Sequence, residues 1–206
     1  MNSNILYFDH QQRLTVQCGR ALPAAQSLLQ LSGHTQLAAG LAAETAALTV
    51  LAAVEQAYQQ GYEQQASTEF ELKGLAFAGY GDPLLHLALL TEVLPAFKTQ
   101  RHGVPVTLVT YGLVATDQAA ALCQQLSNLE VEKLEVYLPA ANPAAYQQAV
   151  QPKQLGFAEV CQFIHSAAEA GIQVSCFAYA PVKHAAELRG LARELGARQF
   201  IALPMA

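Results

Sequence analysis

Charged residues are what this sequence most clearly lacks: Asp, Glu, Lys and Arg make up 13% of its 206 residues, against roughly 25% in typical globular domains. A disordered chain is nevertheless excluded, because disordered chains are poor in apolar residues and 52% of this one is hydrophobic. The formal net charge of −5 supplies no basic surface for nucleic acid or an anionic membrane. We therefore expect a globular protein whose partner is neither nucleic acid nor a membrane.

Cysteine is also scarce, and its spacing excludes several kinds of site. The chain has four cysteines, Cys18, Cys123, Cys161 and Cys176, with no CxxC, CxxxC or CxH spacing among them. A zinc site or a closely spaced cluster-binding loop is therefore not expected. A disulfide framework is not expected at this length either, so reduced and mostly buried thiols are predicted.

Long hydrophobic runs and a targeting segment are missing as well. Residues 1–4 have neither the basic start nor the apolar stretch of a signal peptide. The longest apolar runs, such as residues 46–54, are interrupted by Thr49 and flanked by Glu44 and Glu55, so they are too short and too polar to cross a bilayer. We expect a soluble protein of the cytoplasm.

From about residue 72 onward, short apolar segments alternate with longer helical patterns. Strands are predicted at residues 72–78, 105–110, 133–138, 172–177 and 199–203, and helices at 84–100, 116–127, 143–150, 157–170 and 182–195. Strands separated by ten or more helical residues form parallel sheets. Gly103, Gly171 and Gly196 each follow a predicted helix, where a residue with positive φ is favoured. Asp82-Pro83 and Asn142-Pro143 are typical helix starts.

The first 70 residues are less regular. Residues 5–8 and 13–18 predict two strands joined by a polar turn at 9–12, which is a hairpin. An apolar segment at 21–31 and a break at Ser32-Gly33-His34 follow, and a helix is predicted at about 41–58, before Gly61. If 13–18 is the first parallel strand, the sheet has six parallel strands. That number is too small for the closed eight-stranded barrel and predicts a partial barrel or an open doubly wound sheet.

In parallel βα folds, ligands bind in the loops at the carboxyl ends of the strands. The most informative of these loops is Gly79-Tyr80-Gly81-Asp82-Pro83. Its two glycines would let the backbone approach a ligand closely, and Asp82 would cap the next helix. The simpler interpretation is a tight turn with an ordinary N-cap.

Several such motifs recur in an order that resembles the radical S-adenosylmethionine (radical SAM) superfamily, most of all its TatD-associated branch. The family's Phe-Cys-Gly-Tyr-Gly-Glu-Pro motif stands here as Phe77-Ala78-Gly79-Tyr80-Gly81-Asp82-Pro83. Its Asn-Thr-Asn-Gly-Leu motif is echoed by Val109-Thr110-Tyr111-Gly112-Leu113, and its Ser-Leu-Asn-Ala-Pro-Asp motif with a following Tyr by residues 137–143 and Tyr146.

This resemblance implies an α/β fold, namely a partial (βα)6 TIM-type barrel with an N-terminal hairpin and helix extension. The whole chain, residues 1–206, would form this single domain, with residues 1–40 as an irregular extension that includes the first strand. The resemblance also implies that S-adenosylmethionine or a similar cofactor would bind at Gly79, Tyr80, Gly81, Asp82, Pro83, Thr110 and Tyr111.

The departures from the family pattern are as informative as the matches. The family's CxxxCxxC loop, whose three thiolates hold a [4Fe–4S] cluster, is missing: Cys18 is the only remnant, and residues 19–31 contain no cysteine. Other family positions differ at Ala78, Asp82, His86, Tyr111 and Pro139. The resemblance therefore implies a retained scaffold with neither cluster nor other metal, and without radical catalysis.

Three kinds of function remain open from the sequence. The first is a non-radical binder of S-adenosylmethionine or another nucleoside-like small molecule, or a regulatory partner protein. The second is a small α/β enzyme in which Asp82 and His86 act as an acid/base pair. The third is a structural or interaction protein, because an open barrel has a flank that the N-terminal segment or a second copy in a homodimer must cover.

Overall fold

The computed structural model describes residues 6–8, 13–19, 23–24, 47–64, 73–79, 81–182 and 184–204. The predicted turn at residues 9–12, the apolar segment at 21–31 except for residues 23–24, the break at Ser32-Gly33-His34, and Tyr80 lie outside the described residues. Within the described ranges, no helix is long and apolar enough to cross a membrane.

A single seven-stranded sheet forms the centre of the fold, with the strands side by side in chain order. They are β1 (Leu6–Phe8), β2 (Leu14–Cys18), β3 (Leu75–Gly79), β4 (Val106–Thr110), β5 (Val131–Tyr137), β6 (Gln173–Tyr179) and β7 (Gln199–Leu203). β1 is antiparallel to β2, and each later pair is parallel. Because β1 and β7 are the two ends of this order, the barrel is open. The predicted hairpin and the partial barrel of six parallel strands are thereby confirmed.

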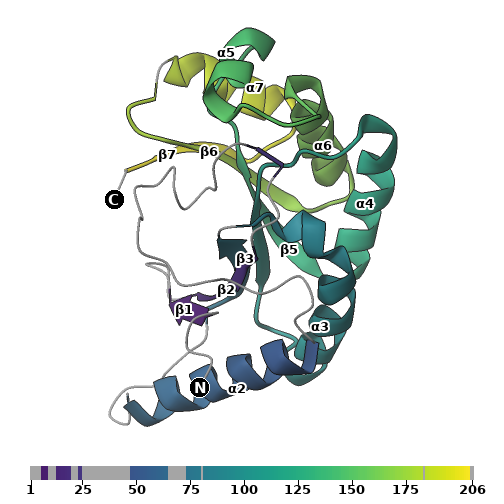
Figure 1. Cartoon of the computed structure of the whole chain (residues 1–206), viewed down its shortest axis with the longest axis vertical. Coiled ribbons are helices and arrows are strands. Elements are labelled where there is room, and N and C mark those ends of the chain that lie inside the picture. The colour runs from purple at the N-terminus through teal and green to yellow at the C-terminus, as the bar shows by residue number, and fades with distance from the viewer. Residues whose placement is uncertain are drawn as a thin grey trace.

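The helices between the strands cover the outside of the sheet. They are α2 (Ala47–Gln64), the 3₁₀ turn η1 (Pro83–His86) leading into α3 (Leu87–Gln100), α4 (Thr116–Asn128), α5 (Pro143–Val150), α6 (Phe157–Glu169) and α7 (Ala185–Glu194). Figure 1 shows α3, α4 and α6 stacked along one side of the sheet. The Cys123 thiol lies 3.8 Å from the carbonyl oxygen of Phe163, which joins α4 to α6.

Two details of the predicted helices were wrong. α2 does not stop before Gly61 but continues to Gln64, because one glycine costs a helix interior only about 1 kcal/mol. Gly103 has no positive φ, whereas Gly171 and Gly196 do, at 83° and 90°. α3 ends at Gln100 and is capped by Arg101, whose φ of −141° is negative, so no left-handed residue is needed there.

The alternation of side chains along the strands gives the sheet two different faces. The outer face is apolar and nearly inaccessible to water; it carries Leu14, Val16, Leu75, Phe77, Leu108, Leu134, Val136 and Val174. The opposite face carries Thr15, Gln17, Thr107, Lys133, Glu135, Ser175 and Gln199. The outer face lies under the helices: a Cβ on Gly112 would meet both Val136 of β5 and Phe163 of α6.

The polar face is the concave one, as an ion pair across it demonstrates. Arg13, which directly precedes β2, donates from Nη1 to Oε1 of Glu135 on β5 at 2.6 Å. β3 and β4 lie between these two strands, and each strand adds about 4.8 Å of sheet width. Side chains so far apart in the sheet can meet only where the sheet curves around them. These polar side chains therefore line the inside of the partial barrel, together with Ala76, Ala78 and Val109 of the same face.

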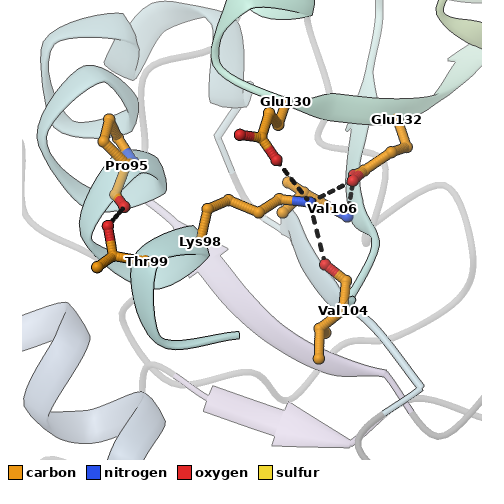
Figure 2. Close-up of polar contacts among 7 residues, drawn as sticks. All are labelled: Pro95, Lys98, Thr99, Val104, Val106, Glu130 and Glu132. Atoms are coloured by element: carbon orange, nitrogen blue, oxygen red, sulfur yellow. Dashed lines mark hydrogen bonds and ion pairs between the residues drawn. The ribbon is translucent and has the colours of Figure 1, made fainter. Parts of the chain in front are cut away.

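A β-bulge lies at the amino ends of β4 and β5. Val106 pairs with Val131 and Thr107 with Lys133, so Glu132 has no partner in the ladder. Its carboxylate instead binds the Lys98 ammonium through one oxygen and accepts the Val106 N–H at 2.6 Å through the other. Lys98 also donates to the Val104 carbonyl at 3.1 Å (Figure 2). This buried lysine joins α3 to the start of two strands, at the barrel end that serves stability.

Candidate functional site

Asp82 is the most densely bonded polar group at the carboxyl edge of the sheet. It caps η1 by accepting the Leu84 N–H at 2.9 Å. The carboxylate also accepts the Thr110 hydroxyl, which lies 2.7 and 2.8 Å from its two oxygens, and the Tyr111 N–H at 2.9 Å. Thr110 in turn accepts the Gly112 N–H at 2.9 Å. Asp82 therefore fastens the loop after β3 to the loop after β4.

Burial governs the charges of this region. The Asp82 side chain is 3% exposed, and burial raises its pKa even though the hydrogen bonds from Tyr111, Thr110 and Leu84 favour the charged form. Neutral groups alone donate to it among the described residues. The nearby Cys18 is inaccessible to solvent, and burial together with the Asp82 carboxylate raises the pKa of its thiol far above the usual range.

These properties do not fit an iron–sulfur cluster. Thiolates are the form of cysteine that binds metals, and the buried thiol of Cys18 stays protonated. No three His, Cys, Asp or Glu side chains of the described residues group together as metal ligands. The remaining cysteines lie on α4, α6 and β6. The spacing of the cysteines predicts no cluster-binding loop, and the structure places the four cysteines on four different elements.

The glycine-rich turn packs against the neighbouring strand. A Cβ on Gly79, whose φ is 125°, would lie 3.2 Å from the Cα of Gln17. The Gly81 N–H donates to the Cys18 carbonyl at 3.1 Å, and Pro83 is buried. The close backbone approach that these glycines permit is therefore made to β2 in the described structure. Thr110 and Tyr111 are brought to the same place through Asp82.

His86 ends η1 and is 8% exposed. Its Nε2 is buried without a hydrogen-bond partner, and burial lowers its pKa, so the ring is neutral near pH 7. No hydrogen bond joins His86 to Asp82 in the described contacts, and the Asp82 oxygens are occupied by Leu84, Thr110 and Tyr111. These contacts offer no support for an Asp82–His86 acid/base pair.

Four aromatic rings, which we call the aromatic cluster, lie at the carboxyl ends of β4, β5 and β6. Tyr111 meets Tyr137 edge-on at a centroid distance of 5.6 Å. Tyr137 packs against Phe177 at 5.5 Å and Tyr179 at 5.8 Å, and Phe177 and Tyr179 are 5.7 Å apart. Alternation places Tyr137, Phe177 and Tyr179 on the concave face. Sequence reasoning missed this cluster, although the alternation of Phe177 and Tyr179 was a signal for it.

The phenol groups of this region are held in their neutral form. Burial raises the pKa of Tyr137 to about 12. Burial, with smaller contributions from Tyr137, Asp82, Tyr146 and Tyr179, raises the pKa of Tyr111 still further. Tyr146 of α5 is fully buried, and its hydroxyl has no hydrogen-bond partner. The carboxyl edge thus combines aromatic rings, un-ionised hydroxyls and one buried carboxylate.

Comparison with known structures agrees with this architecture. The fold is similar to that of SuiB from Streptococcus suis, a radical SAM enzyme, in the structure bound to the precursor peptide SuiA: the TM-score is 0.64 at 11% identity, covering 93% of this chain and 39% of that one. SuiB bound to S-adenosylmethionine gives a TM-score of 0.59 at 11% identity, covering 93% of this chain and 38% of SuiB.

This chain therefore spans less than half the length of SuiB, and at such low identity the likeness concerns the fold alone. The sequence matches no protein-family model and none of the curated proteins compared with it. Taken with the strand order, the likeness shows that the chain is an α/β protein, a partial TIM-like barrel resembling the radical SAM core.

Proposed function

We propose that this protein binds a nucleoside-like ligand, with S-adenosylmethionine among the candidates, and that its own cysteines support no radical chemistry. The aromatic cluster carries the proposal. Tyr111, Tyr137, Phe177 and Tyr179 stand at the strand ends where parallel βα folds bind ligands. Aromatic side chains stack on nucleobases of any type. SuiB, whose fold is similar, has been observed with S-adenosylmethionine bound.

The remaining groups of the site determine how such a ligand would be held. The Asp82 lone pairs are occupied by Leu84, Thr110 and Tyr111, so Asp82 supports the site and leaves ligand contacts to its neighbours. Burial keeps the phenols of Tyr111 and Tyr137 un-ionised at neutral pH, so these two residues bring uncharged rings and hydroxyls to the site. A flat, uncharged base is the ligand group that suits these surfaces.

Calorimetric titration of the purified protein with S-adenosylmethionine, S-adenosylhomocysteine and adenosine tests the proposal. Tyr179 is the half-buried member of the cluster, so its ring can be removed at least cost to the core. We expect Tyr179→Ala to weaken binding about tenfold or more, since base stacking is worth roughly 1–3 kcal/mol. The matched variant Tyr179→Phe keeps the ring and should bind like the wild type. Failure of all three ligands to bind the wild type would overturn the proposal.

Anaerobic reconstitution with iron and sulfide tests the absence of a cluster. We expect no stoichiometric [4Fe–4S] chromophore, because Cys18 is inaccessible and the other three cysteines are dispersed over α4, α6 and β6. Cys18→Ala serves as the control, and its visible spectrum after the same treatment should equal that of the wild type. A stoichiometric chromophore that disappears in Cys18→Ala would contradict this part of the proposal.

A further inference from the structure

Two polar side chains on the concave face of β2 have unused hydrogen-bonding capacity. Thr15 and Gln17, which we call the β2 polar pair, are 1% and 3% exposed. The Thr15 hydroxyl oxygen and the Gln17 Oε1 are both buried without a hydrogen-bond partner. Strands of parallel sheets are ordinarily apolar on both faces, so valine or leucine would suit these positions better. Native proteins seldom leave such atoms unpaired, and each exception requires an explanation.

On the β3 side, the neighbours of the β2 polar pair are small and uncharged. In the sheet, Thr15 lies beside Ala76 and Gln17 beside Ala78, and alanine projects only one methyl group over the face. The nearest charge on this face is Arg13, which Glu135 neutralises at 2.6 Å. A hydroxyl or amine donor is therefore suited to these two acceptor oxygens.

The β2 polar pair and the aromatic cluster belong to one surface. Glu135 and Tyr137 are two residues apart on β5 and so face the same, concave side. Arg13 reaches Glu135 from the start of β2, which places β2 and β5 within the span of two side chains. A single ligand that reaches from β2 to β5 would therefore contact both the β2 polar pair and the aromatic cluster.

We infer that the β2 polar pair binds the sugar hydroxyls of the ligand whose base lies against the aromatic cluster. A ribose hydroxyl donates to Gln17 Oε1, and a second hydroxyl shares a hydrogen bond with Thr15 Oγ1. This inference rests on the proposed function and assigns its substrate class: ribonucleosides, in preference to free bases or dideoxynucleosides. Both groups that bind the sugar come from the first parallel strand, outside the motifs that resemble the radical SAM family.

Conservative variants of the full chain separate this role from a structural one. Thr15→Val and Gln17→Leu remove the polar atoms and keep the side-chain volume. Because no partner is lost, we expect their urea midpoints to equal or exceed that of the wild type. Calorimetric titration should show adenosine binding at least tenfold weaker in each variant, and adenine binding unchanged. The wild type should bind 2′,3′-dideoxyadenosine as weakly as the variants bind adenosine.

Ser166→Ala is the matched control, because Ser166 is a buried polar residue of α6 in the outer helical layer, and its adenosine affinity should be that of the wild type. If the wild type binds adenosine and both β2 variants bind it equally well, the inference fails while the proposed function stands. If the two β2 variants have lower urea midpoints but unchanged adenosine affinity, the two oxygens bind an ordered water instead of the ligand, and the inference is also overturned. If the wild type binds neither adenosine nor adenine, the proposed function fails, and the inference fails with it.

Discussion

A buried charged group lies beside each end of β4, Lys98 at the amino end and Asp82 at the carboxyl end, and the two groups have opposite kinds of partner. At the amino end, the Lys98 ammonium meets the Glu132 carboxylate and the Val104 carbonyl, and Glu132 also accepts the Val106 N–H (Figure 2). At the carboxyl end, the described residues that donate hydrogen bonds to the Asp82 carboxylate are all uncharged. One buried charge is neutralised by its opposite, while the other is merely solvated by protein dipoles.

The distribution of unpaired polar atoms follows the same division. Gln17 precedes the last residue of β2, His86 ends η1, and Tyr146 lies in the helix after β5; each has a buried polar atom without a partner. Thr15, the second residue of β2, is the exception nearer the amino end. Among the described residues, none of the unpaired atoms belongs to the Lys98 network. That network is thus satisfied internally, as a stabilising layer should be, while most of the unpaired atoms lie toward the carboxyl end, where a ligand can bind.

Breaking the Lys98 network should have the largest effect on stability. Lys98→Met keeps the apolar stem but leaves Glu132 and the Val104 carbonyl without their partner. We expect the free energy of unfolding to fall by about 3 kcal/mol, the low end for a broken buried pair, because Glu132 is partly exposed and can turn to water. Urea unfolding measures this loss, and Lys133→Met is the exposed control. Adenosine affinity should not change; a loss below 1 kcal/mol would contradict the comparison.

Changing Asp82 should cost less stability and should alter its pH dependence. Asp82→Asn turns an amide donor toward a backbone N–H, and we expect a loss of about 2 kcal/mol. The folded-state pKa of Asp82 is raised, so its titration contributes stability that is fully present below about pH 4, its unfolded value. That contribution is lost as the pH rises through the folded pKa.

The stability gap between the wild type and Asp82→Asn should therefore be widest in acid and should narrow toward neutral pH. Urea unfolding at a series of pH values measures the gap. A gap that widens with rising pH would mean that the hydrogen bonds from Tyr111, Thr110 and Leu84 outweigh burial.

Removing an unpaired hydroxyl should have a smaller effect of opposite sign. Tyr146→Phe deletes a buried oxygen without a partner and keeps the ring that packs 5.7 Å from Phe157. We expect the free energy of unfolding to rise by about 1 kcal/mol, as measured by urea unfolding of the ligand-free protein. A decrease would show that the hydroxyl is already bonded, for example to a water.

The smallest effect concerns ionisation alone. Tyr137 should titrate near pH 12 in the folded protein, against about 10 for a tyrosine in water. The difference in tyrosinate absorbance between the wild type and Tyr137→Phe isolates this transition. A difference already complete at pH 10 would place Tyr137 in contact with solvent and remove it from the buried part of the aromatic cluster.

The fold could be predicted from local patterns because most of the signals were local. Asp82-Pro83 and Asn142-Pro143 began helical segments as expected, and both side chains accept the predicted capping bonds. β7 was predicted with its observed bounds. The site depends instead on pairing across the sheet. The bonds from Thr110 to Asp82 span 28 residues, and the ion pair that reveals the concave face joins Arg13 to Glu135 over 122 residues. No spacing within one segment contains that information.

The bulge at Glu132 has a consequence for the far end of its own strand. Side chains of a strand alternate between the two faces of the sheet. In a regular ladder, one extra residue would therefore move every later side chain of that strand to the opposite face. In the bulge, Val106 pairs with Val131 before Glu132, and Thr107 pairs with Lys133 after it. The residues of β5 after the bulge therefore face the same side of the sheet as their partners on β4. Because the bulge absorbs Glu132, Glu135 and Tyr137 lie on the concave face and not toward the helices. The bulge that places the Glu132 carboxylate beside Lys98 at the amino end thus also keeps Glu135 and Tyr137 on the concave face toward the carboxyl end.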